Sequence, residues 1–184
     1  LLLLVCVQGG LSAQIPVGEP PCLFDVLHPA GTLQAAESRI GAAVGKQKPS
    51  GVAENNDDIR IVPVVVHVIH NGGSENIGKA QIERQIEILN EDYGKLPGSP
   101  GDGAGVDTRV RFCLAKTDPQ GRCTDGIVRL KTTLTNHQPV DRATLKNLSF
   151  WDNTRYLNVY VVKTISGNVG GYSSFPYSPP DEDG

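Results

Sequence analysis

Apolar and polar residues alternate with two different periods along this chain, and the clearest patterns lie between residues 59 and 93. Ile59–His70 reads IRIVPVVVHVIH, in which β-branched residues follow one another with little polar interruption. Such a run is typical of a strand buried on both faces of a sheet. Pro63 lies near the start of the run, where a missing amide hydrogen is tolerated. We therefore predict a central strand here, at the beginning of the ordered domain.

A helix is predicted next, over Lys79–Tyr93. Its apolar residues recur at helical spacing and form one stripe, made of Ile82, Ile86, Leu89 and Tyr93. Gly78 precedes the stripe as the expected N-cap, and Gly94 follows it in the C′ position that glycine favours. The pattern indicates a surface helix with one face against a core.

Shorter elements follow this helix. Arg109–Lys116 alternates apolar and polar residues, which predicts a half-buried strand. Asp118–Gly121 has the residues of a type I turn, so Ile127–Leu130 is expected to be the return strand of a hairpin. Thr144–Trp151 is expected to be a short helix and Leu157–Val162 a further strand. Together these elements predict an α+β or mixed-sheet domain with helices on one side.

The amino-terminal third has a different composition. Residues 1–13 combine a short apolar run with small residues ending at Ala13, as in the hydrophobic region of a secretory signal. The chain is therefore expected to begin inside its own signal peptide, and a buried terminal strand is the alternative. Residues 14–58 are rich in Gly, Pro and Ala and are predicted to be a pro-segment and linker. A helix over Leu33–Ala43, capped by Thr32, is expected within it.

Composition and charge exclude several classes of protein. The net charge of −3 leaves no basic excess for phosphates, so no nucleic-acid partner is expected. No apolar run is long enough to span a bilayer. An exported chain is exposed to oxidising conditions, where Cys113 and Cys123, which flank a turn, could form a disulfide. Cys6 would be lost with the signal, which leaves Cys22 as an odd thiol.

The histidines do not form a metal site in this pattern. His67 and His70 are separated by an odd number of positions on a strand and point to opposite faces, so they are interpreted as core or rim residues. His28 and His137 have no ligand-spaced neighbour. A Ser–His–Asp hydrolase would need a Gly-x-Ser-x-Gly turn, which the sequence lacks. The residues alone therefore assign no active site.

Two surface motifs carry weaker indications. Asp181–Asp183 is acidic, but it lacks the alternating carboxylates and distal glutamate of a calcium loop, so a solvated turn is the better interpretation. Asn147-Leu148-Ser149 is a glycosylation acceptor if the source organism and the exposure permit it.

Four blocks read together resemble the pappalysin family of secreted metallopeptidases, which includes pregnancy-associated plasma protein-A and ulilysin. The blocks are VPVVVHVIHNGG at 62–73, AQIERQIEILNEDY at 80–93, DTRVRFCLAKTDPQGRCTDGIVR at 107–129, and WDNTRYLNVYVV with GGYSSFP within 151–176. Their order and spacing match from about residue 59 onward.

The resemblance implies an α+β fold of the metzincin type, an upper subdomain with a twisted mixed sheet and backing helix. It would cover residues 59–184 and is truncated before the active-site helix. In that family a HExxHxxGxxH helix holds zinc through three histidines, and its glutamate activates the zinc-bound water. None of those residues is in this chain, which as given is expected to be inactive. A calcium ion is a further cofactor candidate in the part of the protein beyond this chain. The expected partners are protein or peptide substrates.

Two pieces of site chemistry remain within the chain under this resemblance. Cys22 is a candidate zinc ligand that would hold the enzyme latent, although Cys22-Leu23-Phe24 departs from the family's Cys-Gly-Thr. A packing cysteine or an intermolecular disulfide is an equal alternative. Gly171, Tyr172, Ser173 and Ser174 resemble the edge strand along which metzincins bind substrate backbone; an ordinary surface turn is the alternative. The competing function is an exported binding or adhesion module built on the same sheet.

Overall fold

The computed structural model describes residues 58–167 and 169–173, the strand β1 (Leu3–Cys6), and helical residues within 34–35, 37–39 and 41–42. The last group falls inside the helix predicted over Leu33–Ala43. Cys22, Ser174 and Asp181–Asp183 lie outside the described residues. The predicted cleavage after Ala13 and most of the predicted linker also fall outside them.

A central strand organises the sheet. β2 (Arg60–His70) is 11 residues long and pairs in parallel with β3 (Val110–Leu114), β4 (Ile127–Lys131) and β6 (Leu157–Val162). β1 pairs in parallel with the other edge of β6, so this segment of the predicted signal remnant forms a strand, as its alternative interpretation allows. The α+β class is confirmed, and every described ladder is parallel.

The predicted hairpin is wrong. β3 pairs with the first half of β2, from Arg60 to Val64, and β4 pairs with the second half, from Val66 to His70. Residues between them leave the sheet in an excursion closed by the antiparallel bridge of Thr117 with Cys123. β4 then runs in the same direction as β3. The predicted turn at Asp118–Gly121 therefore lies in a loop between two successive strands and does not reverse the chain within the sheet. A long partner strand allows this, because it has room for two short strands in succession.

The predicted disulfide is also absent. Cys113 lies in β3 opposite Pro63 of β2, whereas Cys123 lies in the excursion, at the bridge with Thr117 that closes it. Both are free thiols, the first half-buried and the second exposed.

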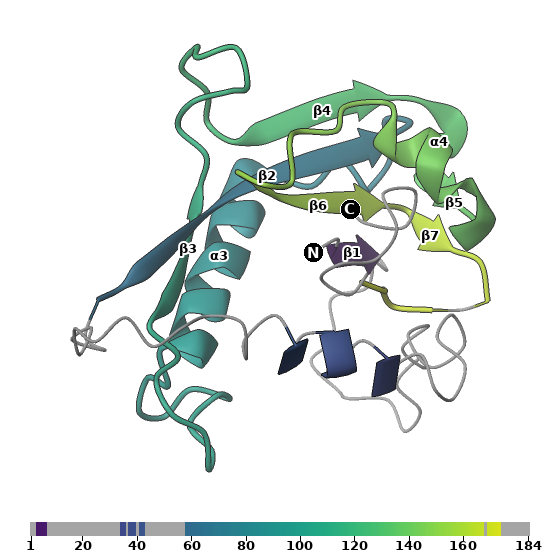
Figure 1. Cartoon of the computed structure of the whole chain (residues 1–184). Helices are drawn as coiled ribbons and strands as arrows, with labels where there is room; N and C mark the ends of the chain where they lie inside the picture. The colour runs from purple at the N-terminus through teal and green to yellow at the C-terminus, as the bar shows by residue number, and fades with distance from the viewer. Residues whose placement is uncertain are drawn as a thin grey trace.

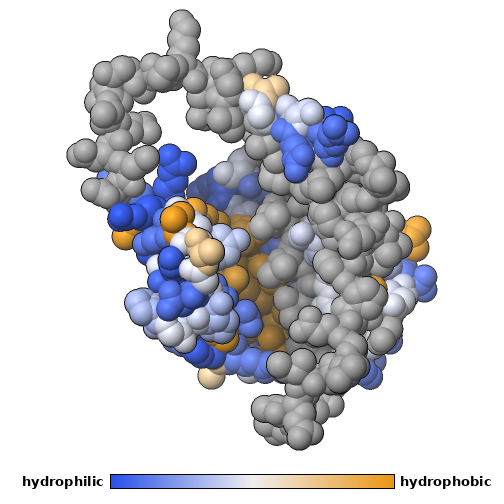
Figure 2. Space-filling view, turned by 90° about the horizontal axis from the view of Figure 1, so that it is seen from below, coloured by the Kyte–Doolittle hydropathy of each residue, from blue (hydrophilic) through white to orange (hydrophobic). Residues whose placement is uncertain are grey.

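The helix α3 (Lys79–Tyr93) has the predicted bounds and packs along one face of the sheet (Figure 1). Its Ile82 is buried in an apolar cluster with the inward residues of the strands: Val64, Val66, Val68, Phe112, Leu114, Leu157, Val159 and Val161. Burying each such side chain contributes roughly 1.5–3 kcal/mol. Seen from below, apolar residues lie at the bottom of a hollow that hydrophilic residues border on one side (Figure 2).

The end of α3 differs from its prediction. Gly94 has φ −85° and is right-handed, and the positive φ of 49° falls on Lys95. Gly94 is nevertheless needed, because a Cβ there would lie 2.7 Å from the Asn90 carbonyl oxygen. Close approach of the backbone, and not left-handed geometry, explains the glycine.

The opposite face is covered by the segments that follow β4. They are two short 3-10 turns (Thr133–Thr135 and Pro139–Asp141), β5 (Asn136–His137), α4 (Arg142–Lys146) and β7 (Thr164–Ile165). α4 overlaps only the start of the helix predicted over Thr144–Trp151. β5 and β7 form a separate parallel ladder near the ends of β2 and β6 (Figure 1). None of the described helices is long and apolar enough to cross a membrane.

The outer edge of β3 is sealed from the helix side. Asn90 of α3 donates its amide to the carbonyl oxygen of Phe112 at 2.8 Å and accepts the Phe112 N–H at 2.7 Å. One side chain thus replaces a neighbouring strand at this residue. An exposed strand edge is a site of unwanted pairing, so this contact both stabilises β3 and protects it.

Replacing Asn90 should therefore weaken the fold. Asn90→Ala leaves both Phe112 groups without these bonds, and we expect the free energy of unfolding to fall by about 2 kcal/mol. Urea denaturation measures this. Glu87→Ala, an exposed change on the same helix, is the control and should stay within about 0.5 kcal/mol of the original. Equal stability of the two variants would contradict the sealing role of Asn90.

Candidate functional site

A buried polar network lies on the face of the sheet opposite α3. His67 of β2 is fully buried, and its Nε2 lies 2.9 Å from Oδ1 of Asn158 in β6. Ser149 Oγ lies 2.8 Å from the other ring nitrogen, Nδ1. The ring also stacks on Tyr160, with centroids 4.5 Å apart, and meets Trp151 edge-on. The network joins two strands to the connection between α4 and β6.

The backbone of Trp151 fixes the direction of these hydrogen bonds. Its N–H donates to Asn158 Oδ1 at 3.0 Å, and its carbonyl accepts from Asn158 Nδ2 at 2.8 Å. The amide orientation is therefore unambiguous, and Oδ1 can only accept from His67 Nε2–H. Nδ1 is then unprotonated and accepts the Ser149 hydroxyl hydrogen.

Ser149, His67 and Asn158 are hydrogen-bonded in the same order as the nucleophile, the base and the orienting residue of a hydrolase triad. The histidine nevertheless lacks the basicity that such a triad needs. A general base works best with a pKa near the operating pH. Burial lowers the pKa of His67 to about 4, although the hydrogen bond with Asn158 opposes the shift. A ring this weakly basic is a poor acceptor for the Ser149 proton. The network is better understood as a neutral clamp that holds the α4–β6 connection on the sheet.

A second buried histidine binds the segment predicted to contact substrate. His137 of β5 and Tyr172 are each 3% exposed, and Nε2 lies 2.7 Å from the tyrosine hydroxyl. The rings are stacked, with centroids 5.8 Å apart and planes inclined by 19°. Burial lowers the pKa of His137 to about 4 and raises that of Tyr172 to about 12, so both groups are neutral at pH 7.

The segment predicted to bind substrate is therefore only partly exposed to solvent. Gly171 and Ser173 are half-buried, whereas the Tyr172 side chain belongs to the core cluster with Ile69 and Tyr160. Residues 171–173 carry no assigned strand, and Ser174 lies outside the described residues. Whether the backbone of this segment binds a peptide stays a prediction.

Glu75, in the loop between β2 and α3, is a buried carboxylate that the sequence did not single out. Its Oε1 accepts the backbone N–H groups of Asn71 at 2.7 Å and Gly73 at 3.3 Å, and the bond from Asn71 is the main cause of its lowered pKa. Oε2 is buried without a hydrogen-bond partner, and Lys163 contributes a favourable charge. The carboxylate organises its own loop, which explains its burial.

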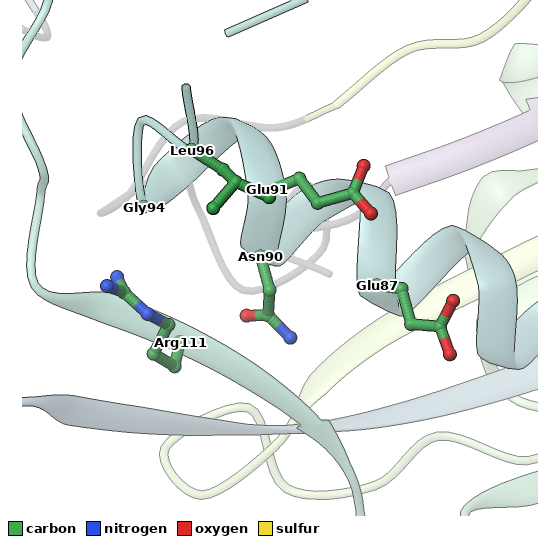
Figure 3. A pocket seen from close by; sticks show the side chains of 6 residues that line it. All are labelled: Glu87, Asn90, Glu91, Gly94, Leu96 and Arg111. Carbon is green, nitrogen blue, oxygen red and sulfur yellow. The ribbon is translucent and has the colours of Figure 1, made fainter. Parts of the chain in front are cut away.

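A groove of about 390 Å³ lies between α3 and the edge of β3 (Figure 3). Its polar side chains already have partners. Arg111 forms a two-bonded ion pair with Asp107 and holds the pKa of that carboxyl at about 2, and Glu91 pairs with Arg84. Asn90 is bound to Phe112, as described above. A ligand would have to displace these contacts, so the groove is a surface depression of the scaffold.

The described residues do not fit a zinc ion. Among them, no three His, Cys, Asp or Glu side chains converge on a point. His67 and His137 both use ring nitrogens for hydroxyl or amide contacts within the fold. The prediction that His67 is a core residue is confirmed. Calcium likewise has no support from the described residues.

Solved structures show what the chain is similar to. A complex of mirolysin with a small compound is 34% identical, with a TM-score of 0.59, over 69% of this chain and 52% of mirolysin. A promirolysin mutant from Tannerella forsythia is 27% identical, with a TM-score of 0.63, over 89% of this chain and 57% of its own. Mature mirolysin with a cleaved peptide is 36% identical, with a TM-score of 0.47, over 54% and 41%. No protein-family model and no curated protein matches the chain.

Mirolysin is a metallopeptidase of the pappalysin and ulilysin type, so the predicted resemblance is confirmed. The sheet with its backing helix matches the metzincin-like fold of these structures. The chain spans about half the length of the mirolysin structures it matches.

The buried histidines predict a specific loss of stability in acid. In the unfolded chain His67 takes up a proton near its ordinary pKa of 6.5, whereas in the folded chain it does so only near 4. The unfolded state therefore binds more protons between these values, and stability falls as pH falls through this window. The contribution of His67 is about 3 kcal/mol between pH 7 and pH 4.

Urea denaturation at several pH values measures this contribution. His67→Gln should reduce the dependence of unfolding free energy on pH by about half, because His137 has a similar shift. His70→Gln, at the half-buried end of β2, is the matched control. An unchanged pH dependence in His67→Gln would contradict the buried neutral state of the ring.

Proposed function

We propose that this chain, whose likeness to the pappalysin-type metallopeptidases is our premise, supplies the first part of the catalytic domain of an exported zinc-dependent endopeptidase. The observation that carries the proposal is the match with mirolysin, which combines 34% identity with a TM-score of 0.59 over 69% of the chain. The matched fold is the parallel sheet with α3. A binding module on the same sheet would share this fold, but the matched structures are of mirolysin, a metallopeptidase.

In this proposal the chain provides scaffold and substrate contacts, and the zinc ligands lie elsewhere in the protein. Zinc would lower the pKa of a bound water and so supply the nucleophile for peptide hydrolysis. The chain's own contribution would be the segment Gly171–Ser174, which offers backbone to an extended protein or peptide substrate. Residues 1–13 would direct export.

Cys22 would keep the precursor latent. A thiolate on zinc occupies the position of the catalytic water, and cleavage within residues 46–58 would remove it. This polar, Pro- and Gly-containing stretch has the composition of an exposed and cleavable connection.

Activity should require more of the protein than this chain. We expect the purified 184-residue chain to leave casein uncut with or without added zinc, because none of its described residues forms a metal site. The protein expressed with the coding sequence that follows Gly184 should cleave casein and lose that activity in a zinc chelator. A downstream sequence without a HExxH helix would instead favour the binding module, and zinc-dependent cleavage by the short chain would refute the division of roles.

The latency proposal is tested in the same longer protein. Cys22→Ser should remove the lag before activity develops, since a serine hydroxyl is a far weaker zinc ligand than a thiolate. The time course of casein cleavage by the freshly purified precursor measures this. Ser38→Ala, an exposed position elsewhere in the predicted pro-segment, is the control. An identical lag in Cys22→Ser would show that the thiol has another role.

A further inference from the structure

We propose that Asn71 is a site of spontaneous deamidation, and that His70 assists the reaction by accepting the hydrogen of the attacking amide nitrogen. Asn71 lies in the loop between β2 and α3, and with Gly72 it forms the one Asn-Gly pair in the sequence. The reaction needs only water as a co-reactant, so the inference does not depend on the proposed function.

The reaction converts the side-chain amide of Asn71 to an acid through a cyclic imide. The backbone nitrogen of Gly72 loses its hydrogen and attacks Cγ of Asn71, and the bond from Cγ to Nδ2 breaks. The released nitrogen leaves as ammonia, which carries away the hydrogen that Gly72 gave up. Water then opens the imide at either of its carbonyl carbons, which yields aspartate or isoaspartate at this position.

The loop leaves the reacting groups accessible. Asn71, Gly72 and Gly73 are exposed to water. Within the described part of the chain, the side-chain amide of Asn71 has no hydrogen-bond partner that would hold it away from the next residue. Gly72 has a φ of +87°, and a Cβ built there would meet nothing within 4 Å beyond its neighbours in the chain. The space around the attacking nitrogen is therefore open.

The hydrogen of the attacking nitrogen already points to a base. The N–H of Gly72 donates to Nδ1 of His70 at 3.2 Å. Because a backbone N–H can only donate, Nδ1 carries the lone pair that accepts this hydrogen. A general base must lie within hydrogen-bond reach of the proton that it removes, and this contact satisfies the requirement. His70 is the last residue of β2 and is half-buried, so the sheet fixes the backbone from which the ring extends.

Two Asp-Gly pairs in the described residues lack such a base. The N–H of Gly103 donates to the carbonyl oxygen of Gly101 at 2.9 Å, and the N–H of Gly126 donates to the Thr124 hydroxyl at 3.1 Å. Carbonyl and hydroxyl oxygens do not take up a proton near neutral pH, whereas an imidazole does. The loop after β2 therefore differs from both of these sites in the group that faces the glycine nitrogen.

Deamidation would disturb the support of the buried Glu75 carboxylate. Its Oε1 accepts the N–H groups of Asn71 and Gly73, and Glu75 is only 1% exposed. Isoaspartate adds a carbon atom to the main chain between residues 71 and 72, so these N–H groups cannot keep their present spacing. Aspartate instead adds a negative charge to the residue whose N–H binds the carboxylate. Either product therefore weakens the loop that joins β2 to α3.

Peptide mapping by mass spectrometry tests the site in the folded 184-residue chain, kept in neutral buffer. We expect Asn71 to deamidate faster than every other asparagine of the described residues and to give both products. The same chain in guanidinium chloride gives the rate that the sequence has without the fold. The folded rate at Asn71 should equal or exceed the unfolded rate. A lower folded rate would overturn the site, because the fold would then protect Asn71.

Variants of His70 test its role as the base. His70→Gln keeps a polar side chain but cannot take up the proton, so deamidation of Asn71 in the folded chain should slow about tenfold, with no change in guanidinium chloride. His70→Leu, a second variant without a base, should slow it equally. Ser74→Ala, an exposed change in the same loop, is the control and should keep the original rate. A His70 variant that is folded by circular dichroism and deamidates as fast as Ser74→Ala would overturn the assistance by His70.

Urea denaturation measures the effect of the modification on the fold. The deamidated chain, separated by ion exchange, should unfold at a midpoint about 0.5 M lower than the intact chain. Asn71→Gln removes the site, and its midpoint should not change during the same incubation. Equal midpoints of the deamidated and intact chains would overturn the proposed effect on the Glu75 loop.

Discussion

The parallel pairing of β2 is the interaction on which the rest of the structure depends. This strand has 11 residues and shares its backbone hydrogen bonds with β6 on one side and with β3 and then β4 on the other. Its side chains serve both layers, because alternate residues point to opposite faces. Val64, Val66 and Val68 meet α3, while Val65, His67 and Ile69 meet the segments on the other side. No other described element contributes to both cores over such a length.

The two faces of the sheet are stabilised in different ways. The α3 face is an apolar cluster closed at its edge by Asn90. The other face buries two histidines, and each makes a hydrogen bond that offsets part of the free-energy cost of removing the ring from water. His67 holds the connection through Ser149, and His137 holds the segment after β7 through Tyr172. Polar pairs give this face directional contacts, which suits segments that have little regular structure of their own.

The match with mirolysin gives these contacts a functional setting. Under the proposed function, a scaffold that covers about half the length of mirolysin would support the site without a metal ligand among the described residues. His67 and His137 both form hydrogen bonds within the fold, and they lie on different strands, β2 and β5. Neither is therefore available as part of a metal site among the described residues. The proposal thus assigns the zinc chemistry and its structural support to separate parts of the protein.

The sequence by itself determined the elements whose pattern is local. The bounds of α3, the buried run of β2 and the core position of His67 follow from residues close together in the chain. The likeness to the metallopeptidase family follows from the order and spacing of four such blocks. Only the tertiary structure decided that β3 and β4 are successive partners of one strand, that Cys113 and Cys123 stay apart, and that Tyr172 turns inward to His137. His67 and Asn158 are 91 positions apart, and His137 and Tyr172 are 35 apart. Periodicity reports the environment of a residue over a few neighbours, whereas such pairs form only when the sheet brings distant segments together.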